Sequence, residues 1–119
     1  MTTSVARVWH GLTREANAAV YLRHVETKGL TSYRAAQGNR GAFVLHRVSN
    51  GVAEFFVISF WDSLDSIRSF VGSDDVNQAI YFPEDRALLL CPEPEVKHYQ
   101  IGGTDLASVL SFLGGLEPG

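Results

Sequence analysis

The chain has 119 residues, which is enough for one domain with its own core and too few for two. Hydrophobic residues make up 45% and charged residues 19%, a balance that excludes a disordered or fibrous chain. The net charge is −3 and lysine and arginine form no run, which argues against a protein that follows nucleic-acid phosphates. The single cysteine, Cys91, excludes an internal disulfide and is typical of a reducing compartment.

Neither a secretory leader nor a membrane span is predicted. The apolar stretch near the start is interrupted by Arg7 and His10, unlike the core of a leader. The longest apolar stretch outside the expected strands, residues 106–116, is too short to cross a bilayer and contains Gly114 and Gly115. The sequence therefore predicts a cytoplasmic protein that binds neither membrane nor nucleic acid.

A strand and a helix are predicted at the start of the chain. Residues 5–10 are β-branched or aromatic, and we expect Gly11 to end this strand. Thr13 is the expected cap of a helix that stops at Gly29, and residues 30–40 are expected to be irregular. The apolar stripe of this helix consists of Ala18, Tyr21, Leu22 and Val25.

A β-hairpin is predicted in the middle of the chain. Residues 41–48 and 52–61 are rich in β-branched and aromatic side chains and are expected to be strands. The Asn50-Gly51 pair between them suits a tight turn, because such turns need residues that accept positive φ.

A second helix and more turns are predicted after the hairpin. Asp62 or Ser63 is the expected cap of a helix that ends at Gly72. Residues 74–80 are expected to add one or two helical turns.

The last part of the chain predicts a turn, a strand and a short helix. Residues 81–85 form an expected aromatic turn, in which Pro83 forces Phe82 toward an extended backbone. Residues 96–101 are the expected final strand, and residues 104–113 are expected to form a helix.

The predicted fold class is α+β. The order β-α-β-β-α-β with a tight central hairpin is typical of a ferredoxin-like sandwich, with four antiparallel strands and both helices on one face. Residues 1–102 form the expected domain, and residues 103–119 a C-terminal extension.

The third strand indicates that the other face of the sheet is covered too. Every residue from 55 to 61 except Ser59 is large and apolar, so both faces of this strand are expected to be buried. Because one domain has no second layer for the far face, we expect a homodimer packed sheet against sheet. The alternative is that the C-terminal segment folds back over that face.

The usual motifs of metal and nucleotide chemistry are missing from the sequence. The histidines stand at positions 10, 24, 46 and 98, with no metal-binding spacing and no cysteine pair. The glycine-rich phosphate loops and the serine-hydrolase elbow are absent as well. No metal site is therefore expected.

Several side chains remain as candidates for a site between sheet and helices. His10 and His24 are the candidate bases, because an imidazole in an apolar pocket takes up a proton near neutral pH. Tyr81 and Arg40 are candidates for orienting a substrate oxygen and stabilising an anion. For each of them the alternative is an ordinary packed or solvated side chain. The expected lining residues are Tyr21, Tyr33, Asn39, His46, Trp61 and Phe70.

Several segments resemble the antibiotic biosynthesis monooxygenase domain family, with the resemblance extending over residues 5–101. Such a resemblance implies a dimeric α+β barrel, made of two ferredoxin-like units that each hold a pocket between sheet and helices. Members of that family include oxygenases that need neither metal nor flavin, deprotonate a phenol or an anthrone, and let the carbanion reduce O2. The segments are residues 6–11, 38–41, 59–63, 81–85 and 95–99.

Relatives in this family include heme-degrading monooxygenases, which use an asparagine on the first strand, a tryptophan on the second helix and a histidine just beyond it. This chain has Val8 or Trp9, Phe70 and Tyr81 at those places, although a tyrosine is able to bind ferric iron. The resemblance thus implies a cofactor-independent monooxygenase for an aromatic or polyketide-like molecule. The alternatives are a non-catalytic barrel that binds heme or a hydrophobic ligand, and an atypical heme-degrading enzyme.

Overall fold

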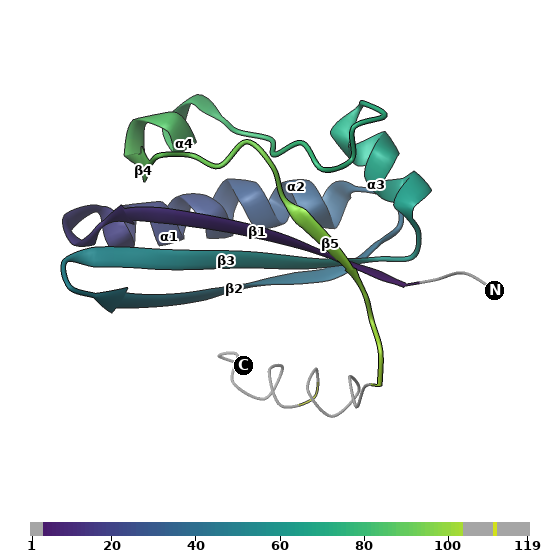
Figure 1. Ribbon diagram of the computed structural model, residues 1–119, viewed down its shortest axis with the longest axis horizontal. Helices are drawn as coiled ribbons and strands as arrows, with labels where there is room; N and C mark the ends of the chain where they lie inside the picture. The colour runs from purple at the N-terminus through teal and green to yellow at the C-terminus, as the bar shows by residue number, and fades with distance from the viewer. Residues whose placement is uncertain (1–3, 104–110, 112–119) are drawn as a thin grey trace.

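A computed structural model describes residues 4–103 and residue 111 of the chain. Within that range the protein forms an antiparallel sheet with its helices on one side (Figure 1). None of the helices in this range combines the length and the apolar character that a membrane crossing needs. The helix predicted over residues 104–113 lies, Ser111 apart, outside the described residues.

The sheet confirms the predicted ferredoxin-like, α+β fold. Its strands follow the order β2-β3-β1-β4, and β5 also pairs with β1, so that β1 and β3 are central. The predicted last strand, residues 96–101, is present as β5, and a two-residue strand, β4, precedes it. Cys91 with φ 46° and the prolines on either side of Glu93, which lack the N–H that a ladder needs, separate β4 from β5. The strands are β1 (Val5–Arg14), β2 (Asn39–Ser49), β3 (Val52–Trp61), β4 (Leu89–Leu90) and β5 (Lys97–Gln100).

The hairpin and the second helix form as predicted. Asn50 and Gly51 join β2 to β3 with φ angles of 54° and 78°. Helix α3 (Leu64–Val71) begins where the Ser63 hydroxyl accepts a hydrogen bond from the Ser66 N–H at 3.2 Å. It ends at Gly72, whose φ of 76° is the left-handed conformation that commonly closes a helix.

The first strand is longer than predicted and does not end at Gly11. A Cβ on Gly11 would lie 2.2 Å from Cη2 of Trp9, so the indole ring packs directly over this glycine. Glycine inside a strand commonly marks such a close approach. The strand therefore continues to Arg14, and Thr13 is a buried strand residue opposite Ala53 instead of a helix cap.

The first helix also runs past the glycine that was expected to end it. A short 3-10 turn (Glu15–Asn17) leads into α1 (Ala18–His24), a π-helical turn (Val25–Gly29) and α2 (Leu30–Ala35). Gly29 has helical angles of −63° and −57°, and α1 and α2 form one rod along the sheet (Figure 1). The prediction of an irregular segment from residue 30 was wrong, because Leu30 and Tyr33 pack against the core and favour helix there.

Residues 74–80 are not helical, contrary to the prediction. Gln78 forms a β-bridge with Glu95. Beside it, the Ala79 N–H donates to the Pro94 carbonyl at 2.9 Å and the Val96 N–H donates to the Asn77 carbonyl at 2.7 Å. Helix α4 (Pro83–Leu88) follows, and Phe82 is extended at φ −84° and ψ 161°, as expected before a proline.

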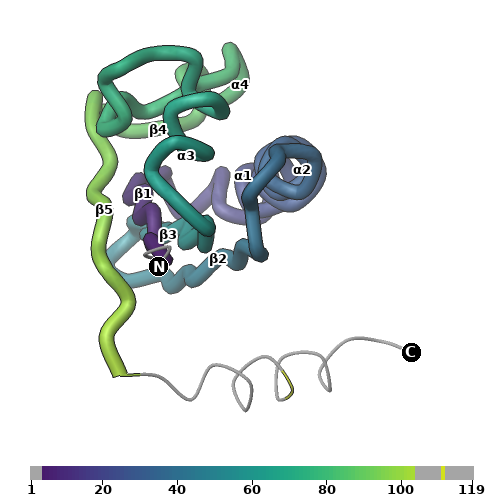
Figure 2. The backbone as a smooth tube through the Cα atoms, turned by 90° about the vertical axis from the view of Figure 1, so that its right-hand side faces the viewer, coloured from purple at the N-terminus to yellow at the C-terminus, as the bar shows by residue number. Residues whose placement is uncertain are grey.

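The two faces of the sheet differ in what covers them. Figure 2 shows α1, α2, α3 and α4 on the same side of the sheet. We call this side the covered face; its residues on the central strands are Val5, Arg7, Trp9, Gly11, Thr13, Ala53, Phe55, Val57, Ser59 and Trp61, all buried. We call the other side the open face; its residues include Ala6, Val8, His10, Leu12, Phe43, Leu45, Phe56, Ile58, Phe60 and Tyr99.

The open face is apolar without being fully buried. Along β3, burial alternates, so that Phe56, Ile58 and Phe60 are half-buried, while Leu45 and Tyr99 are 51% and 52% exposed. In a single chain only the covered face of β3 is buried, and the expected burial of the open face depends on a second layer. Its cover by a second copy stays a prediction.

Candidate functional site

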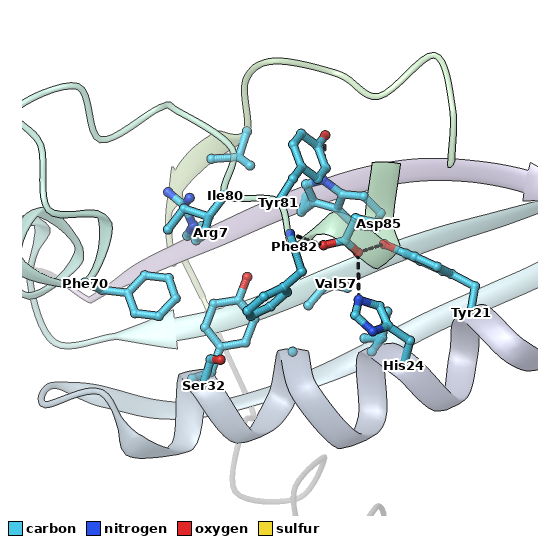
Figure 3. A pocket seen from close by; sticks show the side chains of 15 residues that line it. Arg7, Tyr21, His24, Ser32, Val57, Phe70, Ile80, Tyr81, Phe82 and Asp85 are labelled. Carbon is cyan, nitrogen blue, oxygen red and sulfur yellow. Dashed lines mark hydrogen bonds and ion pairs between the residues drawn. The ribbon is translucent and has the colours of Figure 1, made fainter. Parts of the chain in front are cut away.

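A cavity of about 190 Å³ lies between the covered face and the helices. Figure 3 shows it from close by, with Tyr21 and His24 from α1, Asp85 from α4 and Arg7 from β1 around it. Arg7 and Asp85 bring charge, and His24 an imidazole, to otherwise largely apolar walls. The aromatic lining residues are Trp9, Tyr21, Tyr33, Phe70, Tyr81 and Phe82.

One end of the cavity holds a buried carboxylate with three hydrogen-bond donors. Oδ1 of Asp85 accepts from the Tyr21 hydroxyl at 2.8 Å and from Nε2 of His24 at 2.9 Å. Oδ2 accepts from the Phe82 N–H at 2.6 Å, which also caps helix α4. Asp85 is 6% exposed, so this negative charge is held inside the protein by directed donors.

These contacts fix which atom of His24 is free to act. A carboxylate only accepts, so Nε2 of His24 carries a proton and Nδ1 of a neutral ring keeps its lone pair. Nδ1 lies 4.0 Å from Oε2 of Glu84, which Nζ of Lys28 approaches at 3.1 Å. Burial, and then the neighbouring Asp85, raise the pKa of Tyr21, so its hydroxyl stays a donor.

The roof of the cavity is fixed by a second polar contact. Nε1 of Trp9 donates to the Tyr81 hydroxyl at 3.1 Å, and that hydroxyl donates to the backbone carbonyl of Glu93. The guanidinium of Arg86 lies 5.3 Å from the centre of the Tyr81 ring, and burial raises the pKa of Tyr81. Tyr81 thus has its oxygen engaged by the protein and offers mainly its ring.

The other end of the cavity holds Arg7, which is 2% exposed. Its Nη1 donates to the carbonyl of Val76 at 2.7 Å and to Nε2 of His98 at 3.1 Å, and its Nη2 donates to the carbonyl of Gln78 at 2.9 Å. Its Nε is buried and has no hydrogen-bond partner. Burial, followed by the charge of Arg7, lowers the pKa of His98 to about 4, so His98 is a neutral acceptor.

An aromatic wall lies beside Arg7. The Tyr33 and Phe70 rings are 5.2 Å apart, and Trp61 lies behind them at 6.1 Å and 5.1 Å, respectively. Trp61 is 1% exposed and donates from Nε1 to the Ser59 hydroxyl at 2.9 Å. It therefore supports the wall without lining the cavity, whereas Tyr33 and Phe70 line it as predicted.

His10, the other candidate base, lies outside this cavity on the open face. Its Nε2 is 2.9 Å from Oε2 of Glu54, and its Nδ1 is 2.5 Å from Oε2 of Glu93. Partial burial alone would lower the pKa of His10, but the hydrogen bonds to Glu93 and Glu54 outweigh it and raise the pKa. The alternation of β1 separates it from Trp9, which faces the cavity.

Arg40, Asn39 and His46 also lie away from the cavity. Arg40 and Asn39 border a separate hollow of about 350 Å³ together with Arg34. Nη2 of Arg40 lies 3.8 Å from Asp62, and the Asn39 side chain accepts from the Gly41 N–H at 3.0 Å. His46 is exposed on β2, with its ring 6.0 Å from Phe55.

The cavity thus brings together five of the predicted residues: Tyr21, His24, Tyr33, Phe70 and Tyr81. The expected aromatic turn over residues 81–85 contributes as well, since Phe82 and Asp85 line the cavity. Arg7 and Trp9 were missed as site residues. A signal for Arg7 was present, because it alternates with Val5 and Trp9 and so places a charge at a position that faces the core.

No family model and no curated protein matches the sequence. The structure is similar to that of an antibiotic biosynthesis monooxygenase-type protein from Bacillus cereus, with a TM-score of 0.60 and 13% identity over 87% of this chain and 97% of the other. It is also similar to SnoaB, a cofactor-independent oxygenase from Streptomyces nogalater, with a TM-score of 0.55 and 15% identity over 87% and 95% of the two chains.

A third similar structure is a heme-degrading protein from Mycobacterium tuberculosis. It has a TM-score of 0.52 and 14% identity over 87% of this chain and all 100% of the other. At such identities these likenesses show the fold, which is that of antibiotic biosynthesis monooxygenase-type proteins. The resemblance found in the sequence segments is thereby confirmed at the level of the fold.

Proposed function

We propose that the protein is a cofactor-independent monooxygenase that oxidises a compact aromatic, polyketide-like molecule in this cavity. The observation that carries the proposal is the pair of His24 and Asp85 in the wall of an aromatic cavity. A neutral imidazole oriented by a buried carboxylate is a suitable general base near neutral pH. The fold shared with an oxygenase of the same kind supports it.

The proposed base is Nδ1 of His24. When this atom takes a proton from a phenol or an activated carbon, the ring becomes an imidazolium. Asp85 stabilises that charge at 2.9 Å and keeps the ring in one orientation. Tyr21 and the Phe82 N–H hold the carboxylate in place, so they act as positioning groups.

The substrate itself then supplies the electrons. The deprotonated phenol or anthrone gives one electron to O2, and the resulting radical combines with superoxide to form a hydroperoxide. Loss of water from the hydroperoxide gives a quinone, so one oxygen atom enters the product and the other leaves as water. This balance needs no reductant besides the substrate.

The size and the walls of the cavity support a compact planar substrate. Its volume of about 190 Å³ lies below the roughly 300–1,000 Å³ of pockets for drug-sized ligands. The rings of Trp9, Tyr33 and Phe70 offer flat apolar contact surfaces. They also keep water from the radical pair.

The residues present do not fit a resident heme. An iron ligand would have to come from His24 or Tyr81. Asp85 holds Nε2 of His24 and fixes the ring, so only Nδ1 keeps a lone pair, and the Tyr81 hydroxyl is held by Trp9 and Glu93. The cavity is also small for a tetrapyrrole.

We also propose that two copies pair through the open face. Phe56, Ile58 and Phe60 place a row of apolar side chains on β3, and Phe43 and Leu45 extend it over β2. Contiguous apolar surface of this kind typically marks an interface. Sedimentation velocity of the full chain tests this: a dimer is expected, and a monomer across micromolar concentrations would contradict it.

The function is tested by oxygen uptake. Purified protein is mixed with anthrone or the smaller 1-naphthol. Oxygen uptake is followed at an electrode in air, and the origin of the product oxygen in a parallel reaction under 18O2. We expect protein-dependent uptake and one labelled oxygen in the quinone product. Uptake no faster than in buffer with denatured protein, for these and related phenols, would overturn the proposal.

A second function, non-catalytic binding of a hydrophobic ligand, is favoured by one observation. The hydroxyls of Tyr21 and Tyr81 and Nε2 of His24 already have partners inside the protein. Ligand that binds saturably and is recovered unchanged after hours in air would support this function. Titration with hemin, followed by ascorbate, separates heme binding from heme degradation in the same way.

A further inference from the structure

Arg7 presents a charge that the protein does not neutralise. It is 2% exposed, and among residues 4–103 no carboxylate forms an ion pair with it. A buried charge is costly unless a counter-charge or hydrogen bonds compensate it. The cost is only partly met here, since the described partners are neutral.

The partners of Arg7 are two backbone carbonyls and an imidazole. Val76 and Gln78 supply the carbonyls, and His98 accepts through Nε2. Nδ1 of His98 pairs with the side-chain oxygen of Asn77 at 2.9 Å, which fixes the proton on Nδ1. None of these groups carries a negative charge, so the guanidinium keeps its full positive charge at the cavity.

The guanidinium also keeps donors in reserve. Of its five N–H groups, three are used by these partners. The Tyr33 hydroxyl is a further neutral neighbour, so none of the remaining donors faces an anion. Nε is buried and has no partner. Adjacent N–H groups of a guanidinium match the two oxygens of a carboxylate.

The position of Arg7 gives the cavity two unlike ends. Arg7 lies beside Phe70 and Ile80 in Figure 3, away from the Tyr21, His24 and Asp85 cluster at the other end. Aromatic rings line the space between the two ends. A planar ligand that reaches both therefore meets a cation at one end and the His24–Asp85 pair at the other.

We propose that Arg7 is an anion-binding subsite and that the natural ligand is an aromatic acid, whose carboxylate lies at Arg7 and whose oxidisable ring faces His24. The proposal deepens the proposed function, because it concerns the same cavity and names the class of substrate. The carboxylate supplies the missing counter-charge, so binding removes the cost of the buried cation. An uncharged ligand of the same shape leaves that cost in place.

The first test compares two ligands on the unaltered protein. Calorimetric titration with 2-naphthoate and with 2-naphthamide, which differ in charge but hardly in shape, measures the preference directly. We expect 2-naphthoate to bind about 10-fold to 100-fold more tightly, as charge-assisted hydrogen bonds commonly provide. Equal binding, tighter binding of the amide, or no binding of either would overturn the proposal.

The second test removes the charge. In Arg7→Met, which keeps an unbranched side chain of similar length, we expect the preference for naphthoate to disappear while naphthamide binds as before. Arg34→Met, on the exposed outer side of α2, is the matched control and should keep the preference. A folded Arg7→Met protein with an unchanged preference would overturn the proposal.

Arg7 also ties residues 76–78 to β1, so Arg7→Met is checked by circular dichroism before its binding is interpreted. If it fails to fold, Arg7→Lys keeps a charge but loses the planar pair of N–H groups that matches a carboxylate, and we expect a reduced preference there. The comparison of the two ligands on the unaltered protein decides in any case. A purely structural role of Arg7 predicts no dependence on ligand charge.

The outcomes separate this inference from the proposed oxygenase activity. The binding experiments are done under nitrogen and need no turnover. A naphthoate preference without oxygen uptake by any phenolic acid would keep the subsite and remove the oxygenase. Oxygen uptake with 1-naphthol together with indifference to ligand charge would keep the oxygenase and remove the subsite.

Discussion

The covered and open faces are built from alternate residues of the same strands, yet they carry different kinds of side chain. On β1, Arg7 and Trp9 face the helices, while Val8 and His10 face the other way. The covered face encloses a cavity with an anionic end and a cationic end. The open face is apolar and half-buried at Phe56.

This difference indicates that the proposed reaction takes place at the covered face and the proposed pairing of two copies at the open face. A charged group is retained at a core position only where it has partners or a task, and Arg7 and Asp85 are such groups. His10 is held between Glu54 and Glu93, so it has a sufficient structural role where it is. One residue of register therefore separates a cavity residue from a surface residue.

The largest effect on activity is expected when His24 and His10 are each replaced by asparagine, in two separate variants. His24→Asn removes the proposed base, and we expect the rate of oxygen uptake to fall by about 100-fold to 10,000-fold, the usual share of general base catalysis. His10→Asn on the open face is the matched control and should retain most of the activity. Equal losses in the two variants would mean that the faces do not divide the work as proposed.

Adjacent phenylalanines on β3 test the same division through stability. Phe55 is 0% exposed, and Phe55→Ala is expected to lower the free energy of unfolding by about 3–5 kcal/mol. Phe56→Ala is expected to cost less in the isolated chain, because Phe56 is only half-buried, and to weaken the dimer instead. Denaturant titration and sedimentation measure the two effects; a larger loss of stability in Phe56→Ala would contradict the assignment of the faces.

The space over Gly11 offers a smaller test of the covered face. A Cβ there would lie 2.2 Å from the Trp9 ring, so Gly11→Ala must displace the indole from its place above the strand. We expect a loss of about 1–3 kcal/mol, typical of overpacking. Gly102→Ala meets nothing within 4 Å and serves as the control. A Gly11→Ala protein as stable as the control would show that the ring is not held there.

Much of the fold was predictable because local signals and packing agree. The turn at Asn50-Gly51 and the helix cap at Ser63 depend only on contacts within a few residues of the chain. Gly29 failed as a stop signal because packing of Leu30 and Tyr33 outweighs the weak preference of a glycine.

The site was only partly predictable for a related reason. His24 and Tyr21 share one flank of a helix, which the spacing indicates, and the cavity contains both. Their contact with Asp85 joins residues more than sixty positions apart, which no local pattern encodes. The alternation of β1 placed Arg7 among core positions, so its role was readable in principle.

Acid should lower the free energy of unfolding through protonation of His98, which lies beside Arg7. Burial and Arg7 lower its pKa from 6.5 to about 4, so the unfolded chain binds a proton that the folded chain does not. Its contribution to stability is therefore full above pH 6.5 and is lost as the pH falls toward 4. Denaturant titrations at several pH values measure this. The free energy of unfolding should depend less on pH between 6.5 and 4 in His98→Gln, while His46→Gln on exposed β2 should leave the pH dependence unchanged.

His10 on the open face should make the free energy of unfolding fall as the pH rises, which is the opposite direction, and this is the smallest of the expected effects. Hydrogen bonds to Glu93 and Glu54 raise the pKa of His10 above 6.5 despite partial burial. The stabilisation is complete below pH 6.5 and is lost as the pH rises through the raised value. His10→Gln should remove this slope, and a slope that survives the substitution would assign it to another group.

The most direct test of the division between the faces is to map ligand binding by backbone amide chemical shifts. Titration of labelled protein with 2-naphthoate is predicted to move the amides of Arg7, Tyr21, His24 and Tyr33, around the cavity, and to leave those of Phe43 and Leu45 on the open face in place. Shifts concentrated on Phe43 and Leu45, with the cavity residues unmoved, would contradict the assignment of the cavity as the ligand site.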